Sequence, residues 1–594
     1  MNYDKREDVP DIYKWDLTTR YKDDKAFEKD YLKNLKSYKE ITKYQGKVLE
    51  SSKTLLICLN KYFEIKKNIL KLYVYANCKL NENVEDSDNS LRLNKALSLY
   101  YKFIEASSYL KPEILKGSKS VLTRYLKTKN LKPYQFYLEN ILREKEHTLS
   151  EREEMIISKL SATSDVNKKI SEVLTNSVIN YGTIIVDGKK VELTNANYRN
   201  IITNKNRATR KEAFDKITTN IKTYESIYGI NLAANMKYVK NIAEVYNFNT
   251  VLEMDLFDSN IPPEVVSNLY TTIEKRLDIL RKYFLLIKQN LSLDKLEYYD
   301  IKAEIISTDI TFSIEEAKLI LEKSLSILGD EYLKILKRAF AEKWIDFGTY
   351  KGKTSSIYAT SNYGNAPLVS THFLGKFQDI STLAHELGHA VAFELSSVQP
   401  IQNWSGSLLT AEVASLTNEV LISDYIIKEA SDKNLKLTAI ASLLDTIQNN
   451  LFDASLEGKF ENIIYEKLEK GEEVNANTFN ETIYELRKDY YGDSVNLNDK
   501  VKSMWIRRMH YFSPYYLFKY ATGISSAIYI ATNIIENKNN MKEKYLDFLK
   551  NDGSDYPTNL LERMGVNLTK TKVINEALDY MDYLINEFNR ISEE

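Results

Sequence analysis

Two histidines four residues apart, with a glutamate beside the first, are the residues of this sequence best suited to chemistry. They are His385, Glu386 and His389, in the segment TLAHELGHAV. Residues i and i+4 share a face of an α-helix, so both imidazoles can bind one Zn²⁺ ion at about 2.0–2.1 Å. Glu386 would then lie near enough to take a proton from an attacking water. The spacing predicts a catalytic zinc site on a helix.

The flanking residues predict the helix that this motif needs. Residues 379–382 read Asp-Ile-Ser-Thr, three of which are N-cap residue types, and no proline interrupts residues 383–395. Apolar side chains recur on a face that the histidines do not share. We expect this face to be buried; its members are Ile380, Leu383, Ala384, Leu387 and Val391.

A catalytic zinc ion needs a third protein ligand and an open fourth position. No further histidine extends the motif, so a carboxylate is the better candidate. We choose Glu412 as the third ligand, because it opens a second predicted helix and has apolar neighbours on both sides. Glu394, in the first helix, would face away from the histidines. Glu419, two turns after Glu412, is either an acceptor for a ligand histidine's other nitrogen or a surface carboxylate.

Several segments together resemble the oligoendopeptidase F family, relatives of thimet oligopeptidase and neurolysin. They are TLAHELGH, AEVASLTNE, YKWDL, LENILREKEHTLSE, KGK with YGNAP, and HYFSPYYLFKYATG, and they cover most of the chain. The resemblance implies a mainly α, two-lobed zinc metallopeptidase with a deep substrate channel and a small β element near the active site. Such an enzyme cuts internal bonds of short unfolded peptides. The family pattern places one Zn²⁺ per chain on His385, His389 and Glu412, with Glu386 as general base.

The sequence departs from the family pattern in places. Ala390, Val391 and Ala392 stand where the family usually has Ser-Met-His, but that lost histidine is not a zinc ligand in the family. The strand Pro367–Phe373 also differs, which could change how a substrate is gripped. Phe518 stands where the family often has a tyrosine, which removes one hydroxyl.

A tyrosine-rich segment could supply donors to the oxyanion of the tetrahedral intermediate. Tyr516 and Tyr520 are one helical turn apart, and His510 begins the same segment. Such a helix is by itself more often part of a core. The resemblance implies that His510, Tyr516 and Tyr520 face the zinc and act in catalysis, with Tyr515 competing with Tyr516 for that role.

A cluster of glycine, serine and β-prone residues over 347–377 interrupts the helical pattern just before the zinc motif. Within it we expect Pro367–Phe373 to be an edge strand that binds a peptide backbone as an added strand. Tyr358 and Gly364 match the family pattern and are expected to bind substrate in the same cleft.

Composition limits the remaining function classes. The 594 residues carry 82 basic and 83 acidic side chains, a net charge of -1, which gives no electrostatic basis for binding nucleic acid or a membrane surface. Only Cys58 and Cys78 are present, the amino terminus lacks a signal-like apolar run, and no stretch is long enough to span a membrane. We expect a soluble, cytoplasmic protein whose partners are short peptides; nothing sets its oligomeric state.

The low numbers of glycines (18) and prolines (9) favour long helices. We expect an amino-terminal helical region over residues 1–195 and the catalytic region over residues 196–594. Residues 183–194 form two β-prone runs around Asp187-Gly188, which predicts a hairpin. Apolar stripes of helical period run through residues 55–73, 265–291, 314–336 and 440–452.

Two alternatives to an endopeptidase stay open. A carboxypeptidase or dipeptidyl carboxypeptidase would need a fixed cation for the terminal carboxylate, and Arg507, Arg508 and Lys519 are candidates. A non-catalytic peptide-binding protein would have no need of Glu386 beside a metal.

Overall fold

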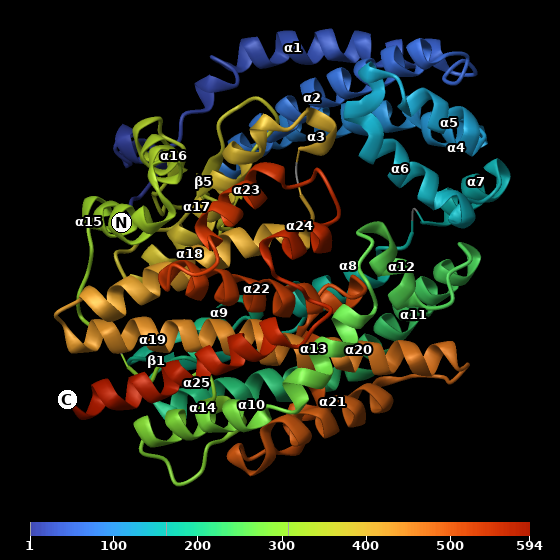
Figure 1. Cartoon of the computed structure of the whole chain (residues 1–594). Coiled ribbons are helices and arrows are strands. Elements are labelled where there is room, and N and C mark those ends of the chain that lie inside the picture. Colours follow the sequence, from blue (N-terminus) through green and yellow to red (C-terminus); the bar gives the residue numbers. More distant parts are fainter. Residues whose placement is uncertain (1, 162, 307, 405) are drawn as a thin grey trace. The chain divides into compact units, whose positions relative to one another are not determined.

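The computed structural model describes residues 2–161, 163–306, 308–404 and 406–594, and helices make up most of them (Figure 1). The expected mainly α class is confirmed. The strands among these residues are short and belong to a two-stranded and a three-stranded sheet. In this part of the chain, no helix combines the length and apolar character that crossing a membrane requires.

The chain folds into two compact units, each assembled from three separate stretches of sequence. Whether the chain also divides by role near residue 195 stays a prediction, because these units are defined by contacts. Unit 1 comprises Met1–Thr148, Thr311–Ile422 and Ile530–Met564, and unit 2 comprises Leu149–Ile310, Ser423–Tyr529 and Gly565–Glu594.

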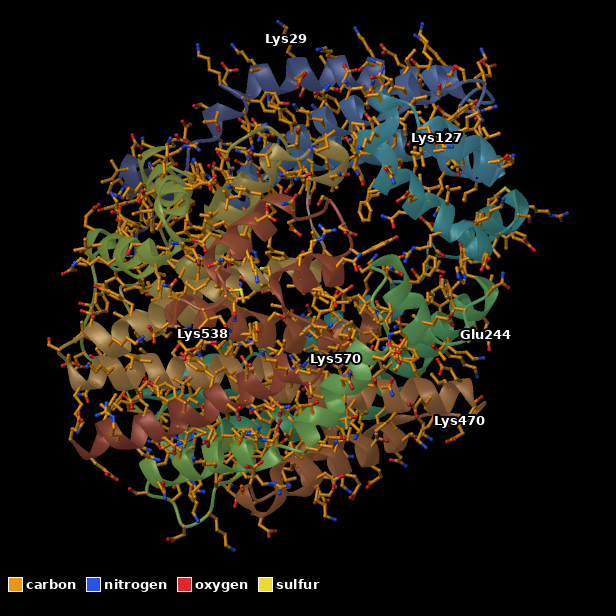
Figure 2. The ribbon with its side chains drawn as sticks, viewed as in Figure 1. Lys29, Lys127, Glu244, Lys470, Lys538 and Lys570 are labelled. Carbon is orange, nitrogen blue, oxygen red and sulfur yellow. The ribbon has the colours of Figure 1, made fainter. Side chains whose placement is uncertain are left out.

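The first stretch of unit 1 has a helical core of its own. Its longest helix, α2 (Ser52–Glu82), begins where the Ser51 hydroxyl accepts a hydrogen bond from the backbone N–H of Thr54. The stripe predicted over residues 55–73 lies on α2, which packs against α1 and α3 (Figure 1). Lys29 of α1 points away from these helices (Figure 2). The other helices of this stretch are α1 (Asp24–Ser37), α3 (Ser87–Ser107), α4 (Leu110–Lys116), α5 (Lys119–Leu126) and α6 (Gln135–Arg143).

The rest of unit 1 adds the helices that carry or cover the zinc motif. The stripe predicted over residues 314–336 is divided between two helices, because Gly329 adopts a left-handed φ of +91° between them. These helices are α15 (Ile314–Ser324), α16 (Asp330–Ala341), α17 (Phe377–Leu395), α18 (Leu408–Glu429), α23 (Met541–Asn551) and α24 (Pro557–Met564), with α18 beginning in this unit.

Unit 2 contains the predicted hairpin, β1 (Thr183–Val186) paired with β2 (Lys189–Glu192), and this prediction is confirmed. Asp187 and Gly188 have φ of 49° and 78°, as the tightest hairpin turns require. The stripe over residues 265–291 is broken at Arg276 into α13 and α14. The helices are α7 (Glu151–Ser161), α8 (Val166–Val173), α9 (Asn195–Ile201), α10 (Arg207–Thr223), α11 (Glu225–Val245), α12 (Val251–Asp258), α13 (Glu264–Glu274), α14 (Leu277–Asn290), α19 (Lys433–Ile447), α20 (Ala454–Glu469), α21 (Ala476–Tyr491), α22 (Phe518–Ile535, which begins here) and α25 (Lys572–Glu593).

The three-stranded sheet of unit 1 has the order β3-β5-β4. Strand β5 (Leu368–Ser370) pairs in parallel with β3 (Ile345–Asp346) and antiparallel with β4 (Tyr358–Thr360). The expected strand in 367–373 is therefore present, but it is central and buried rather than at the edge. Because both of its sides are already paired, it cannot accept an added strand; β4, which packs on α17, is the edge strand near the motif.

The amino-terminal segment is tied to this sheet through a buried carboxylate. Both oxygens of Asp346, at the end of β3, accept hydrogen bonds of 3.0 Å from Arg6. Arg6 also donates to Glu82 of α2 at 2.8 Å, and the buried Lys353 ammonium lies 3.2 Å from Asp346. The sheet thus depends on residues that precede the first helix.

Candidate metal centre

Helix α17 carries the predicted zinc motif, and its first turn is capped from within. It begins at Phe377, earlier than the capping residue types suggested, and Asp379 Oδ2 accepts hydrogen bonds of 2.9 Å from the backbone N–H groups of Leu374 and Lys376. A carboxylate in this position satisfies amides that lack helical partners. The expected apolar face is buried: Ile380, Leu383, Ala384, Leu387 and Val391 are each 0% exposed.

Helix α18 lies close against α17 because of a glycine. A Cβ atom on Gly388 would stand 2.7 Å from the Cα of Ser415, so only glycine allows the two backbones this approach. One turn away the buried Asn418 amide donates to the carbonyl of Ala384 at 2.9 Å. Shape and a buried hydrogen bond therefore fix how the two helices lie together.

This packing brings the three predicted zinc ligands together. One ligand atom each from His385, His389 and Glu412 lies within 4.8 Å of the others. The Nε2 of His385 is 3.6 Å from Glu412 Oε2. Two ligands about 2.1 Å from a tetrahedral zinc ion are about 3.4 Å apart, so this separation suits a shared metal.

Each histidine has a hydrogen-bond partner besides the other ligand residues, and zinc-bound imidazoles usually need such a partner. His385 Nδ1 is 2.7 Å from Glu419 Oε1, and Ser381 Oγ donates to the other oxygen of Glu419 at 3.3 Å. His389 forms a hydrogen bond with the backbone of Ala411. The contact foreseen for Glu419 is therefore present, and the donor set fits zinc: two oriented imidazoles and one carboxylate.

The electrostatics of the two histidines differ. Burial by itself lowers the pKa of His385, but the hydrogen bond and charge of Glu419, together with the charge of Glu412, raise it to about 9. Burial and the charge of His385 lower the pKa of His389 to about 3. Because metal ligands must be deprotonated, zinc binding to this group would release a proton from His385.

Glu386 is positioned as a base next to the ligand group. Its side chain is 8% exposed, and burial, assisted by the charge of Glu412, raises its pKa to about 7. The backbone of Ala359 on the edge strand β4 forms a hydrogen bond with the Glu386 carboxylate. A carboxyl group with a pKa near neutrality can both accept and return a proton.

The other predicted catalytic residues gather within unit 2. His510 lies on a 3-10 turn (Met509–Phe512), and its ring centroid is 5.4 Å from that of Tyr516 and 6.0 Å from that of Tyr520. Burial, with the nearby charges of cationic side chains, lowers the pKa of His510 to about 4, so its ring is neutral near pH 7.

Tyr515 and Tyr516, the two candidates for the catalytic role, have different surroundings. Tyr515 is 2% exposed and donates its hydroxyl to Asn462, so it is a core residue. The Tyr516 ring lies beside those of His510 and Tyr520, and its role in catalysis stays a prediction.

The two predicted substrate-binding residues lie on and after β4. The hydroxyl of Tyr358 accepts a hydrogen bond of 2.6 Å from Asn81 of α2, so it is directed into unit 1. Gly364 is exposed in the following loop and adopts a φ of +81°. Their contact with substrate stays a prediction.

Three residues of the site were not identified from the sequence. Gly388 had a signal, because a glycine inside a helix costs about 1 kcal/mol and usually indicates close packing. Asn418 had a similar signal, because it is a polar residue in an apolar helix and a buried polar group usually has a hydrogen-bond partner. The backbone contact of Ala359 with Glu386 had no signal in the sequence, because it depends on the order of the strands.

Comparison with known proteins extends this description. The sequence model of peptidase family M3 matches residues 200–580, and that of oligopeptidase F matches residues 113–181. An oligoendopeptidase F homolog of Borreliella burgdorferi is 32% identical over 600 residues, covering 99% of each chain. Oligopeptidase PepF of Bacillus subtilis is 29% identical over 581 residues, covering 97% of this chain and 87% of that protein.

Solved structures share the fold along nearly the whole chain. A crystal structure from Chlamydophila abortus has a TM-score of 0.91 at 28% identity, covering 99% of this chain and 100% of that one. The oligoendopeptidase-F structure from Enterococcus faecium has a TM-score of 0.75 at 24% identity, covering 96% and 99%. The fold and the sequence together define a helical peptidase. The chain belongs to peptidase family M3, and the resemblance to oligoendopeptidase F is confirmed.

Proposed function

We propose that this peptidase is a zinc-dependent endopeptidase that hydrolyses internal bonds of short unfolded peptides. The observation that carries the proposal is the convergence of His385, His389 and Glu412 beside the buried Glu386. Histidine and carboxylate ligands suit one Zn²⁺ ion per chain and leave a fourth position open.

Glu386 is the proposed general base. Its carboxylate accepts a proton from the attacking water, and its raised pKa lets it pass that proton to the leaving amine. The hydrogen bond with Ala359 holds the carboxylate in one orientation, beside the three ligand residues that would hold the ion. When bound, zinc supplies Lewis-acid polarisation of the scissile carbonyl.

The edge strand β4 is the proposed support for the peptide backbone. One side of β4 pairs with β5, and among the described residues its other side pairs with no strand. A peptide added to this side would gain main-chain hydrogen bonds, which favour extended substrates with little dependence on their sequence. Extended, unfolded peptides satisfy that requirement, whereas folded proteins do not.

His510, Tyr516 and Tyr520 are proposed to stabilise the tetrahedral intermediate by donating hydrogen bonds to its oxyanion. Phenol hydroxyls are suited to this task, and removing one such donor typically lowers kcat by about 10²–10³-fold. Tyr516→Phe and Tyr520→Phe test the role, because each change removes only the hydroxyl. Equal kcat in both variants and the wild type would contradict it.

The contacts of the candidate cations support an endopeptidase over a carboxypeptidase. Arg508 forms an ion pair with the partly buried Glu457, and Lys519 lies 3.0 Å from Asp255. Arg507 stacks over the ring of Tyr198. With these partners, none of the three is left as a dedicated group for a terminal carboxylate.

A peptide digest tests the proposed function. The protein, with its metal content measured, is incubated with peptides of graded length, with amidated and free C-termini, and with an unfolded protein. We expect internal cuts in the short peptides, equal for both C-termini, and their loss in Glu386→Gln with zinc still bound. Cleavage that survives this substitution would refute the mechanism. Cleavage of the free-acid peptides without cleavage of the amidated ones would favour an exopeptidase. Zinc-loaded protein that cleaves no peptide would favour a binding protein.

A further inference from the structure

The turn that precedes α22 in unit 2 contains a strained residue. Tyr515 adopts a φ of +47°, in the left-handed region that bulky side chains avoid. Such a conformation costs about 1–3 kcal/mol and persists only where the surroundings hold it. No glycine or asparagine relieves the strain at this position, so other groups must maintain it.

Three side chains of α20 hold Tyr515 in this conformation. Its backbone N–H donates to Glu461 Oε1 at 2.9 Å, and its hydroxyl donates to Asn462 Oδ1 at 3.1 Å. Its ring stacks on Tyr465, with centroids 5.6 Å apart and an interplanar angle of 25°. The hydrogen bond to Glu461 is the one that acts on the backbone itself.

Glu461 is not explained by stability. The residue is 1% exposed, and its second oxygen has no hydrogen-bond partner among the described residues. Burial raises the pKa of this carboxyl well above its usual range, which shows how unfavourable its surroundings are for a charge. A leucine of similar size would avoid the cost of burying an unpartnered polar atom. The group therefore has a local task, and its one described hydrogen bond is to the backbone of Tyr515.

The conformation of Tyr515 sets the direction of the next side chain. Tyr516 follows it directly, and the Tyr516 ring lies 5.4 Å from both His510 and Tyr520. Return of Tyr515 to an ordinary helical φ near −60° would rotate the chain by roughly 100° at this point and move Tyr516 out of that group.

We infer that Glu461 is a positioning residue for peptide hydrolysis, holding the left-handed turn at Tyr515 so that Tyr516 stays beside His510. The inference rests on the proposed function, in which Tyr516 acts on the oxyanion. Glu461 itself touches none of the reacting atoms.

The test compares Glu461→Gln with Glu461→Leu, because glutamine keeps an acceptor for the Tyr515 N–H and leucine does not. Steady-state kcat and KM are measured on a fluorogenic peptide, with zinc content and Tm measured on the same samples. We expect the glutamine variant to stay within about twofold of wild type. The leucine variant should lose at least about tenfold in kcat, as expected for a displaced oxyanion donor, with KM, zinc content and Tm little changed.

Glu469→Leu is the matched control. Glu469 is also on α20 and also accepts a backbone hydrogen bond, at 2.8 Å, but from Val251 rather than from Tyr515. This variant should keep its kcat. A leucine variant at 461 with wild-type kcat, a glutamine variant as impaired as leucine, or a kcat loss that merely follows Tm would overturn the inference.

Tyr516→Phe separates failure of this inference from failure of the proposed function. If this variant lowers kcat while Glu461→Leu does not, only the positioning role is wrong. If Tyr516→Phe leaves kcat unchanged, the premise fails, and the inference falls with it.

Discussion

Substitution of Gly388 by alanine tests whether the close approach of α17 and α18 builds the metal centre. The new Cβ atom would lie 2.7 Å from Ser415 Cα, whereas ordinary contacts begin at 3.4 Å. The helices must therefore separate by roughly 0.7 Å, the difference between these distances. Ser415 is one turn beyond Glu412 on α18, so the third ligand would move with it.

The magnitudes separate two effects of this change. Overpacking costs about 1–3 kcal/mol, while alanine returns about 1 kcal/mol of helix propensity, so the net loss of stability is about 0–2 kcal/mol. Metal-ligand distances tolerate only about ±0.2 Å. We therefore expect Gly388→Ala to remain folded but to bind zinc at least about tenfold more weakly, with a matching loss of activity at limiting zinc.

The assay is competition for zinc against a chromophoric chelator, run beside urea denaturation of the metal-free protein. Ala392→Gly is the control, because it changes helix propensity on the same helix without adding volume. Gly388→Ala with wild-type zinc affinity and wild-type peptide hydrolysis would refute the reasoning.

Three further predictions follow from single contacts. Glu419→Ala should weaken zinc binding by about 10–100-fold through loss of the hydrogen bond to His385, with Glu419→Gln nearer to wild type; equal affinity of Glu419→Ala and wild type in chelator competition would contradict this. Arg6→Met should lower the free energy of unfolding by about 3 kcal/mol, because it removes a cation from the buried Asp346; a loss below about 1 kcal/mol in urea denaturation would show that the contact is dispensable. Burial raises the pKa of Asp255 from 3.8 to about 6, so its protonation stabilises the fold below pH 4 and this contribution is lost as the pH rises through 6. The stability of Asp255→Asn relative to wild type should therefore increase between pH 4 and 6, by up to about 3 kcal/mol, and a flat difference would exclude the shift.

The grouping of the three proposed ligands could be predicted because most of the information that it needs is local. His385 and His389 share a helix, and the period of that helix alone places them on one face. Glu412 needed a different argument, from the absence of a third ligand, and it is Gly388 that makes its approach physically possible. The hairpin at Asp187-Gly188 was predictable for the same reason, because its turn chemistry is local.

Features that depend on contacts between distant segments were not predictable. The run of residues 367–373 has the composition of a strand, but its central place follows from pairing with β3 and β4, which no local pattern encodes. The left-handed turn at Tyr515 also left no signal, because it is enforced by Glu461 from another helix rather than by a glycine. Strand order, and backbone strain that another helix imposes, cannot be inferred from the local sequence.

The interleaving of the two units has a consequence for biosynthesis. Helices α1–α6 leave the ribosome before α17 and have a core of their own, so they can begin to fold during translation. Helix α17 cannot be fully packed at that stage, because it contacts α23. Helix α23 belongs to the last stretch of unit 1, Ile530–Met564. The histidine helix is therefore partly uncovered until α23 has been synthesised, so the proposed metal site is fully enclosed only after that point.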